Sequence, residues 1–127
     1  MKNTEEYIHV KSFNIPLYRG KLVVVLTNCD KVKSLIPTFD TTALYASAIY
    51  DNYKGFQGYF CILNFDNELR RIKHGTIAHE AYHIANFLCT HRGIKEDLEN
   101  DEPAAYLIEW IVDRIYEVCK KYGFSII

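Results

Sequence analysis

The spacing of the apolar residues changes between the two halves of the chain, and this change limits the folds that the chain can adopt. In the first half they form short runs rich in β-branched and aromatic side chains, such as residues 22–27. In the second half they recur every three or four residues, which is the period of an amphipathic helix. Strands followed by helices predict an α+β domain, with helices packed against one small mixed or antiparallel sheet. The 127 residues suffice for a single domain, residues 1–127, and no repeat divides them.

Three segments of the first half have the composition of strands. Residues 22–27 predict a buried strand. Residues 41–50 and 57–65 are rich in Tyr, Ile, Phe and Ala, and residues 51–55 between them have the composition of a turn, so the two segments predict a hairpin. Residues 30–36 are a candidate for a short helix, which the proline after them would end.

Two helices are predicted in the second half. The first covers residues 76–90, with an extension back to residue 68 as an alternative, and Gly93 stands where a helix C-cap belongs. A polar and acidic connection, residues 95–101, leads to the second helix, residues 103–121, which has a proline at a favoured first-turn position.

The first predicted helix contains two histidines four residues apart, His79 and His83. This spacing places both imidazoles on one side of the helix, one turn apart. Two nitrogen donors in this arrangement can hold one zinc ion at about 2.0–2.1 Å from each. Glu80 projects about 100° around the helix from His79, which leaves it outside the pair but close enough to act as general base on a zinc-activated water. A chance occurrence of the pattern is the alternative, and its place on an amphipathic helix after a strand favours the metal site.

The apolar residues of this helix form a continuous arc on the side away from His79 and His83. We expect the arc to pack against the sheet and the two histidines to face a cleft. The arc consists of Ile77, Ala78, Ala81, Ile84, Ala85 and Leu88.

A catalytic zinc site needs a third protein ligand and one open position, whereas a structural zinc site is closed by four ligands that commonly include several cysteines. No cysteine lies at ligand spacing from the histidines, which favours the open site. The downstream candidates for the third ligand are His91, Glu96, Asp97, Glu99, Asp101, Glu102 and Glu109.

Glu102 is the preferred third ligand because it opens the next helix, which is a rigid element. It shares one stripe of that helix with Tyr106, Glu109 and Asp113, so we expect the polar fronts of the two helices to share a cleft. The alternative is that Glu102 is an acidic residue near a helix N-terminus, where the helix dipole favours it. The opposite side of the helix is apolar, with Ala104, Ile108, Ile111, Ile115 and Val118.

His79-Glu80-x-x-His83, followed 18 residues later by Glu102, resembles the pattern of gluzincin metallopeptidases, the thermolysin-like branch of the zincins. Compact forms occur among phage- and mobile-element-associated peptidases related to the ImmA/IrrE group. The resemblance covers about residues 57–116. It implies a zincin-like fold, a Zn²⁺ cofactor bound by His79, His83 and Glu102, Glu80 as general base, and a peptide or protein substrate. It also implies that the strand of residues 57–65 is the edge that aligns an extended substrate by backbone pairing.

Tyr106 is the main departure from the family pattern, because thermolysin-like enzymes have an aspartate four residues after the ligand glutamate that orients a ligand histidine. Glu109 or Asp113 could supply that support instead. Tyr106 could donate a hydrogen bond to the developing oxyanion, as a catalytic residue, or it could be a packing aromatic. His91 has the same two interpretations, with a solvated loop histidine as the favoured one.

Composition excludes several classes of protein. The charges are balanced, with 15 basic and 16 acidic residues and no basic block, so nucleic-acid binding is not expected. The longest apolar run, residues 22–26, is too short to cross a bilayer, and no signal-peptide pattern is present, so we expect a cytoplasmic protein without a membrane association. The four cysteines are widely spaced and are expected to be reduced.

Together, these observations predict a zinc-dependent peptidase. Two alternatives stay open. One is a non-catalytic, zincin-like interaction or structural protein, for example a phage accessory or virion component. The small size of the chain and its 10 tyrosines, a residue type enriched at interfaces, favour that alternative. The other is a peptidase that acts only on one bound protein partner, as in the processing of an antitoxin or a repressor.

Overall fold

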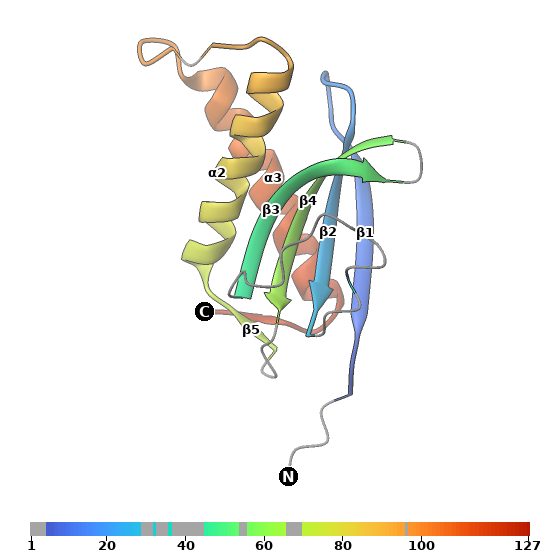
Figure 1. Ribbon diagram of the computed structural model, residues 1–127. Helices are drawn as coiled ribbons and strands as arrows, with labels where there is room; N and C mark the ends of the chain where they lie inside the picture. Colours follow the sequence, from blue (N-terminus) through green and yellow to red (C-terminus); the bar gives the residue numbers. More distant parts are fainter. Residues whose placement is uncertain are drawn as a thin grey trace.

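The computed structural model describes residues 5–28, 32, 36, 45–53, 56–65, 70–95 and 97–127, and Figure 1 shows the arrangement of the elements. The elements in chain order are β1 (Ile8–Asn14), β2 (Lys21–Thr27), β3 (Tyr45–Tyr53), β4 (Phe56–Phe65), β5 (Arg71–Ile72), α2 (His74–His91), α3 (Glu102–Lys121) and β6 (Ser125–Ile126).

Four of the strands form one mixed sheet with the order β1-β2-β4-β3. The pairs β1–β2 and β4–β3 are antiparallel, and the central pair β2–β4 is parallel. The central strands are buried on both faces, which explains why residues 22–27 form a nearly continuous apolar run instead of alternating with polar residues. β1 and β3 are the edge strands of this sheet.

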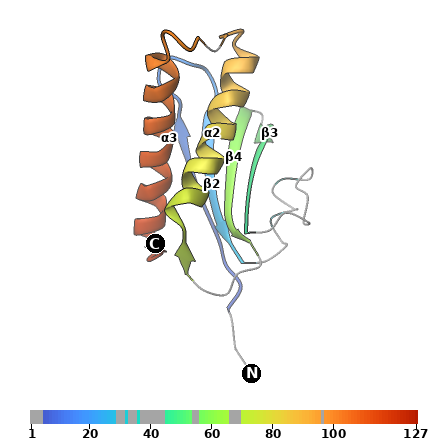
Figure 2. The same ribbon diagram turned by 90° about the vertical axis from the view of Figure 1, so that its left-hand side faces the viewer.

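Both helices cover the same face of the sheet, as the two views in Figures 1 and 2 show. Alternate residues of the central strands point to that face and form the main core with α2 and α3, for example Val24 on β2 and Cys61 on β4. The residues between them point to the opposite face, where Val23 and Phe60 pack with Val32 and Ile36. The sheet therefore has apolar packing on both sides.

Both helices end in the same hydrogen-bonded motif, in which a glycine adopts a left-handed conformation. After α2, Gly93 has φ +69°, and the N–H of Ile94 donates to the carbonyl of Cys89 at 2.9 Å. After α3, Gly123 has φ +77°, and the N–H of Phe124 donates to the carbonyl of Cys119 at 2.9 Å. The predicted cap at Gly93 is confirmed. The chain then returns through β6, which pairs in parallel with β5 just before α2 begins.

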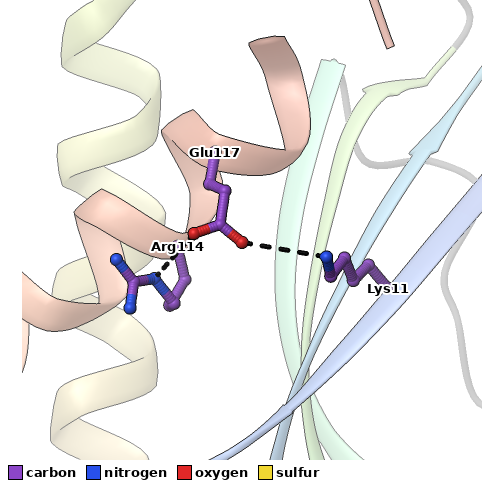
Figure 3. A network of polar contacts seen from close by, with 3 residues as sticks. All are labelled: Lys11, Arg114 and Glu117. Carbon is purple, nitrogen blue, oxygen red and sulfur yellow. Dashed lines mark ion pairs between the residues drawn. The ribbon is translucent and has the colours of Figure 1, made fainter. Parts of the chain in front are cut away.

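An ion-pair network joins α3 to the edge strand β1 (Figure 3). Glu117 Oε2 lies 3.8 Å from Lys11 Nζ, and Glu117 Oε1 lies 3.6 Å from Arg114 Nε. All three side chains are partly exposed, so each pair contributes at most about 1 kcal/mol. The docking of α3 depends instead on its buried residues, which are Leu107, Ile111, Ile115, Val118 and Cys119.

The structure confirms the α+β class, the buried strand at residues 22–27, the hairpin and both helices, and it corrects four details. β3 continues through Tyr53, so the first three residues of the predicted turn at 51–55 are strand. The alternative extension of the first helix back to residue 68 is wrong, because residues 71–72 form β5. The strand at 57–65 is central, since β4 pairs on both sides, and β3 is the edge. β1 was not among the predicted segments. The short helix predicted at residues 30–36 lies mostly outside the described residues.

Candidate metal centre

His79 and His83 lie on the exposed side of α2, in its middle turns, and their rings approach each other. The two Nε2 atoms are 3.2 Å apart, and the ring planes are inclined at 72°. Two nitrogens bound at about 2.0–2.1 Å to one tetrahedral ion are separated by about 3.3–3.4 Å. The spacing of the two donor atoms therefore fits a shared zinc ion.

Two aromatic rings lie near the His83 imidazole. The ring of Phe87 lies nearly parallel to it, with centroids 6.4 Å apart and an interplanar angle of 23°. The ring of Tyr82 meets it edge-on at 6.4 Å. Of these two rings, that of Phe87 is packed against the main core.

Glu80 lies between the histidine pair and the sheet, and its exposed fraction is only 7%. Burial raises the pKa of the Glu80 carboxyl, while the imidazoles of His79 and His83 act in the opposite direction. Glu80 is also one cause of the raised pKa of the Cys61 thiol on β4, after burial itself, which places the carboxyl near the helix-facing side of the sheet. A buried carboxyl of raised pKa beside two exposed imidazoles is an arrangement suited to accept a proton.

The buried arc of α2 differs from the predicted arc at two positions. Ile77, Ala81, Ile84, Ala85 and Leu88 are buried as expected, but Ala78 is exposed and Glu80 is buried. The reason is that α2 packs against β3 as well as against α3 and β4, which shifts the covered side of the helix toward Glu80.

Glu102 does not join the two histidines in this structure. It is exposed at the first residue of α3, and because the two helices run in opposite directions, it lies near the end of α2 (Figures 1 and 2). Among the residues that the structure describes, no group of three His, Cys, Asp or Glu side chains is placed to hold a metal ion. The structure therefore brings together His79, Glu80 and His83, and the third ligand stays a prediction. Another candidate, Glu96, lies outside the described residues.

The stripe of Glu102, Tyr106, Glu109 and Asp113 is exposed along its whole length, and 64% of Tyr106 is exposed. The cavity that does form between α2 and α3 is lined by none of these four residues. The predicted shared cleft is thus not formed by the stripe, because α3 turns its apolar side toward both the sheet and α2. The structure does not bring Tyr106, Glu109 or Asp113 to the histidine pair.

His91 had been expected in the loop after α2, but it is the last residue of that helix. A hydrogen bond of 3.0 Å joins its Nδ1 to the hydroxyl of Tyr59, which is fully buried on β4. Its ring lies 4.0 Å from that of Tyr50 on β3. His91 thus attaches the end of α2 to two strands. This contact was not predicted from the sequence, because it joins a helix end to strands that are distant along the chain.

The described cysteines are all reduced, as expected. Burial raises the pKa of the Cys119 thiol to about 12 and the pKa of the Cys61 thiol well above its ordinary value. Both thiols are therefore protonated at neutral pH and act as small apolar side chains. Cys89 is partly exposed at the cavity between the helices.

Comparisons with known proteins gave no match: no family model, no curated protein and no solved structure matches the chain. Among the described residues, no helix is long and apolar enough to span a bilayer. The functional interpretation consequently depends on the geometry of the site alone.

Proposed function

We propose that this protein is a zinc-dependent hydrolase that cleaves peptide bonds, with His79 and His83 as two of its zinc ligands. The observation that carries the proposal is the separation of 3.2 Å between the Nε2 atoms of these residues on an exposed helix surface. Bound zinc would supply a Lewis acid that lowers the pKa of a water molecule to about 7. Glu102 is the predicted third ligand, and a zincin-like fold is part of the same proposal.

Glu80 is the proposed general base. Its burial keeps the carboxyl out of bulk solvent and raises its pKa, and a base of raised pKa accepts a proton more readily. The two imidazoles lie on the exposed side of α2, and Glu80 lies on its covered side about 100° around the helix from His79, so the three side chains occupy little more than one turn. The same carboxyl can return the proton to a leaving amine.

The position of β3 at the edge of the sheet is an argument for a peptide substrate. α2 packs beside it, and none of the described strands pairs with its outer edge. An extended peptide can add to such an edge by backbone hydrogen bonds. We therefore assign this role to β3, whose outer edge pairs with none of the described strands, and no longer to β4, which the sequence had suggested.

The experiment combines metal analysis with a cleavage screen. Zinc-loaded protein is incubated with a mixture of synthetic peptides, and new termini are identified by mass spectrometry, with the Glu80→Gln variant as control. Cleavage by the unmodified protein and not by the variant supports the proposal. Equal cleavage by both proteins contradicts it.

A non-catalytic interaction protein is the second candidate function. The observation that favours it is the missing third ligand among the described residues. In that case the protein binds a partner equally well before and after Glu80→Gln, and the zinc-loaded protein cleaves neither peptides nor that partner.

A further inference from the structure

A cavity of about 440 Å³ opens between α2 and α3 at the end of the molecule where the two helices are connected. Its volume is within the roughly 300–1,000 Å³ that is typical of ligand pockets. Small side chains of both helices line it, Ala85 on α2 and Ala104 on α3. Ile108 and Cys89 complete an apolar floor.

The rim of this cavity is formed by the connection between the helices, which contributes Ile94, Lys95, Asp97, Asn100 and Asp101. The charged residues of the lining are two aspartates, Asp97 and Asp101, and one lysine, Lys95. The described rim therefore carries a net negative charge, which favours a ligand with cationic groups over a phosphate or carboxylate ligand.

Apolar surface continues outward from the cavity. Two large lining residues are exposed to solvent, Ile94 by 36% and Tyr82 by 48%. Large apolar side chains at the mouth of a pocket indicate a contact surface for a protein segment, because a small molecule inside the pocket would leave them uncovered. Tyr82, which lines the cavity, directly precedes His83 in α2.

We infer that this cavity is a docking site for a peptide segment that inserts one apolar side chain, of about the size of leucine or phenylalanine, and carries lysine or arginine on either side. The apolar side chain occupies the space between Ala85, Ala104 and Ile108. The basic residues contact the acidic rim around Asp97 and Asp101. Docking requires no metal, so the inference stands independently of the proposed zinc site.

The test is a binding measurement on metal-free protein in the presence of EDTA, so that failure of zinc binding cannot affect it. The probe is a fluorescein-labelled peptide with the core Lys-Arg-Phe-Lys-Arg, compared with Lys-Arg-Ala-Lys-Arg and Glu-Asp-Phe-Asp-Glu. Fluorescence anisotropy gives the Kd of each. The phenylalanine peptide with basic neighbours is expected to bind at least about tenfold more tightly than either of the others.

Two neighbouring alanines provide matched variants. Ala104→Phe fills the cavity and is expected to weaken binding by about tenfold or more, while Ala105→Phe, at an exposed position outside the lining, is expected to change the Kd by less than about twofold. Circular dichroism and thermal unfolding confirm that both variants fold.

A second measurement uses the unmodified chain and needs no variant. Cys89 lines the cavity, so bound peptide is expected to slow its alkylation by iodoacetamide, as located by mass spectrometry, and the alanine peptide is not. The inference is overturned if the three peptides bind alike, if none binds, if Ala104→Phe leaves the Kd unchanged, or if Cys89 is alkylated at the same rate with and without the phenylalanine peptide.

Discussion

In the middle turns of α2, His79 and His83 point their Nε2 atoms at each other from exposed positions. At the end of the same helix, His91 forms a hydrogen bond with the buried hydroxyl of Tyr59 and lies against the ring of Tyr50. The sheet provides partners for His91, whereas the polar neighbour of the other two, the buried Glu80, belongs to α2 itself. The histidines of one helix therefore differ in role: His91 attaches α2 to the sheet, whereas His79 and His83 present donor atoms at the surface.

The largest expected effect concerns the site around His79 and His83. Glu80→Gln is expected to lower the turnover of a cleaved peptide by about 10²–10⁴-fold, because the general base is removed. Zinc content and thermal stability are expected to stay unchanged, since the amide has the same shape and needs no buried charge. Glu109→Gln, at an exposed position on α3, is the matched control and is expected to retain full turnover. Equal losses in both variants would contradict the role of Glu80.

The variant His91→Ala tests whether His91 stabilises the fold. This change leaves the buried Tyr59 hydroxyl without its partner and is expected to lower the free energy of unfolding by about 1–3 kcal/mol. Chemical denaturation gives the value. In the double variant His91→Ala with Tyr59→Phe, part of the loss is expected to be recovered, because no hydroxyl is then left unsatisfied. Strictly additive losses would show that the two side chains are not coupled.

The variants His79→Ala and His83→Ala test whether the exposed histidine pair also stabilises the fold. Both side chains are exposed, so each change is expected to alter the free energy of unfolding of the metal-free protein by less than about 0.5 kcal/mol. The same denaturation experiment, with EDTA present, measures it. A loss as large as that of His91→Ala would mean that the pair is structural.

His9, on β1, gives a small effect that depends on pH. Burial, and then the charge of Arg70, lower its pKa, and its ring is stacked on Tyr122 with centroids 4.0 Å apart. The unfolded chain therefore binds a proton first as the pH falls below about 6.5, so stability decreases on the acid side and is unaffected above it. His9→Phe is expected to make the decrease between pH 7.5 and 5.5 less steep, by less than about 1 kcal/mol because the ring is partly exposed. An unchanged pH profile would argue against this role.

The local features of this comparison could be predicted from the sequence. The period of the apolar residues indicated α2 and α3, the spacing of His79 and His83 placed them on one side, and Gly93 marked the end of α2. These features depend on residues within a few positions of each other, where helix geometry alone determines the outcome.

The long-range features could not be predicted. Whether β4 is central or at an edge depends on its pairing with β2, which is distant in the sequence. The burial of Glu80 depends on the packing of α2 against β3, and the position of Glu102 depends on which side α3 turns toward α2. The cavity is lined by residues of both helices, such as Ala85 and Ala104, which come together only in the folded protein.

The most direct test of the central claim is the zinc content of purified protein after reconstitution, determined by elemental analysis for the unmodified chain, His83→Ala and His91→Ala. The account predicts about one zinc ion per chain in the unmodified protein and in His91→Ala, and none in His83→Ala. No zinc in the unmodified protein, or equal zinc in His83→Ala, would contradict it.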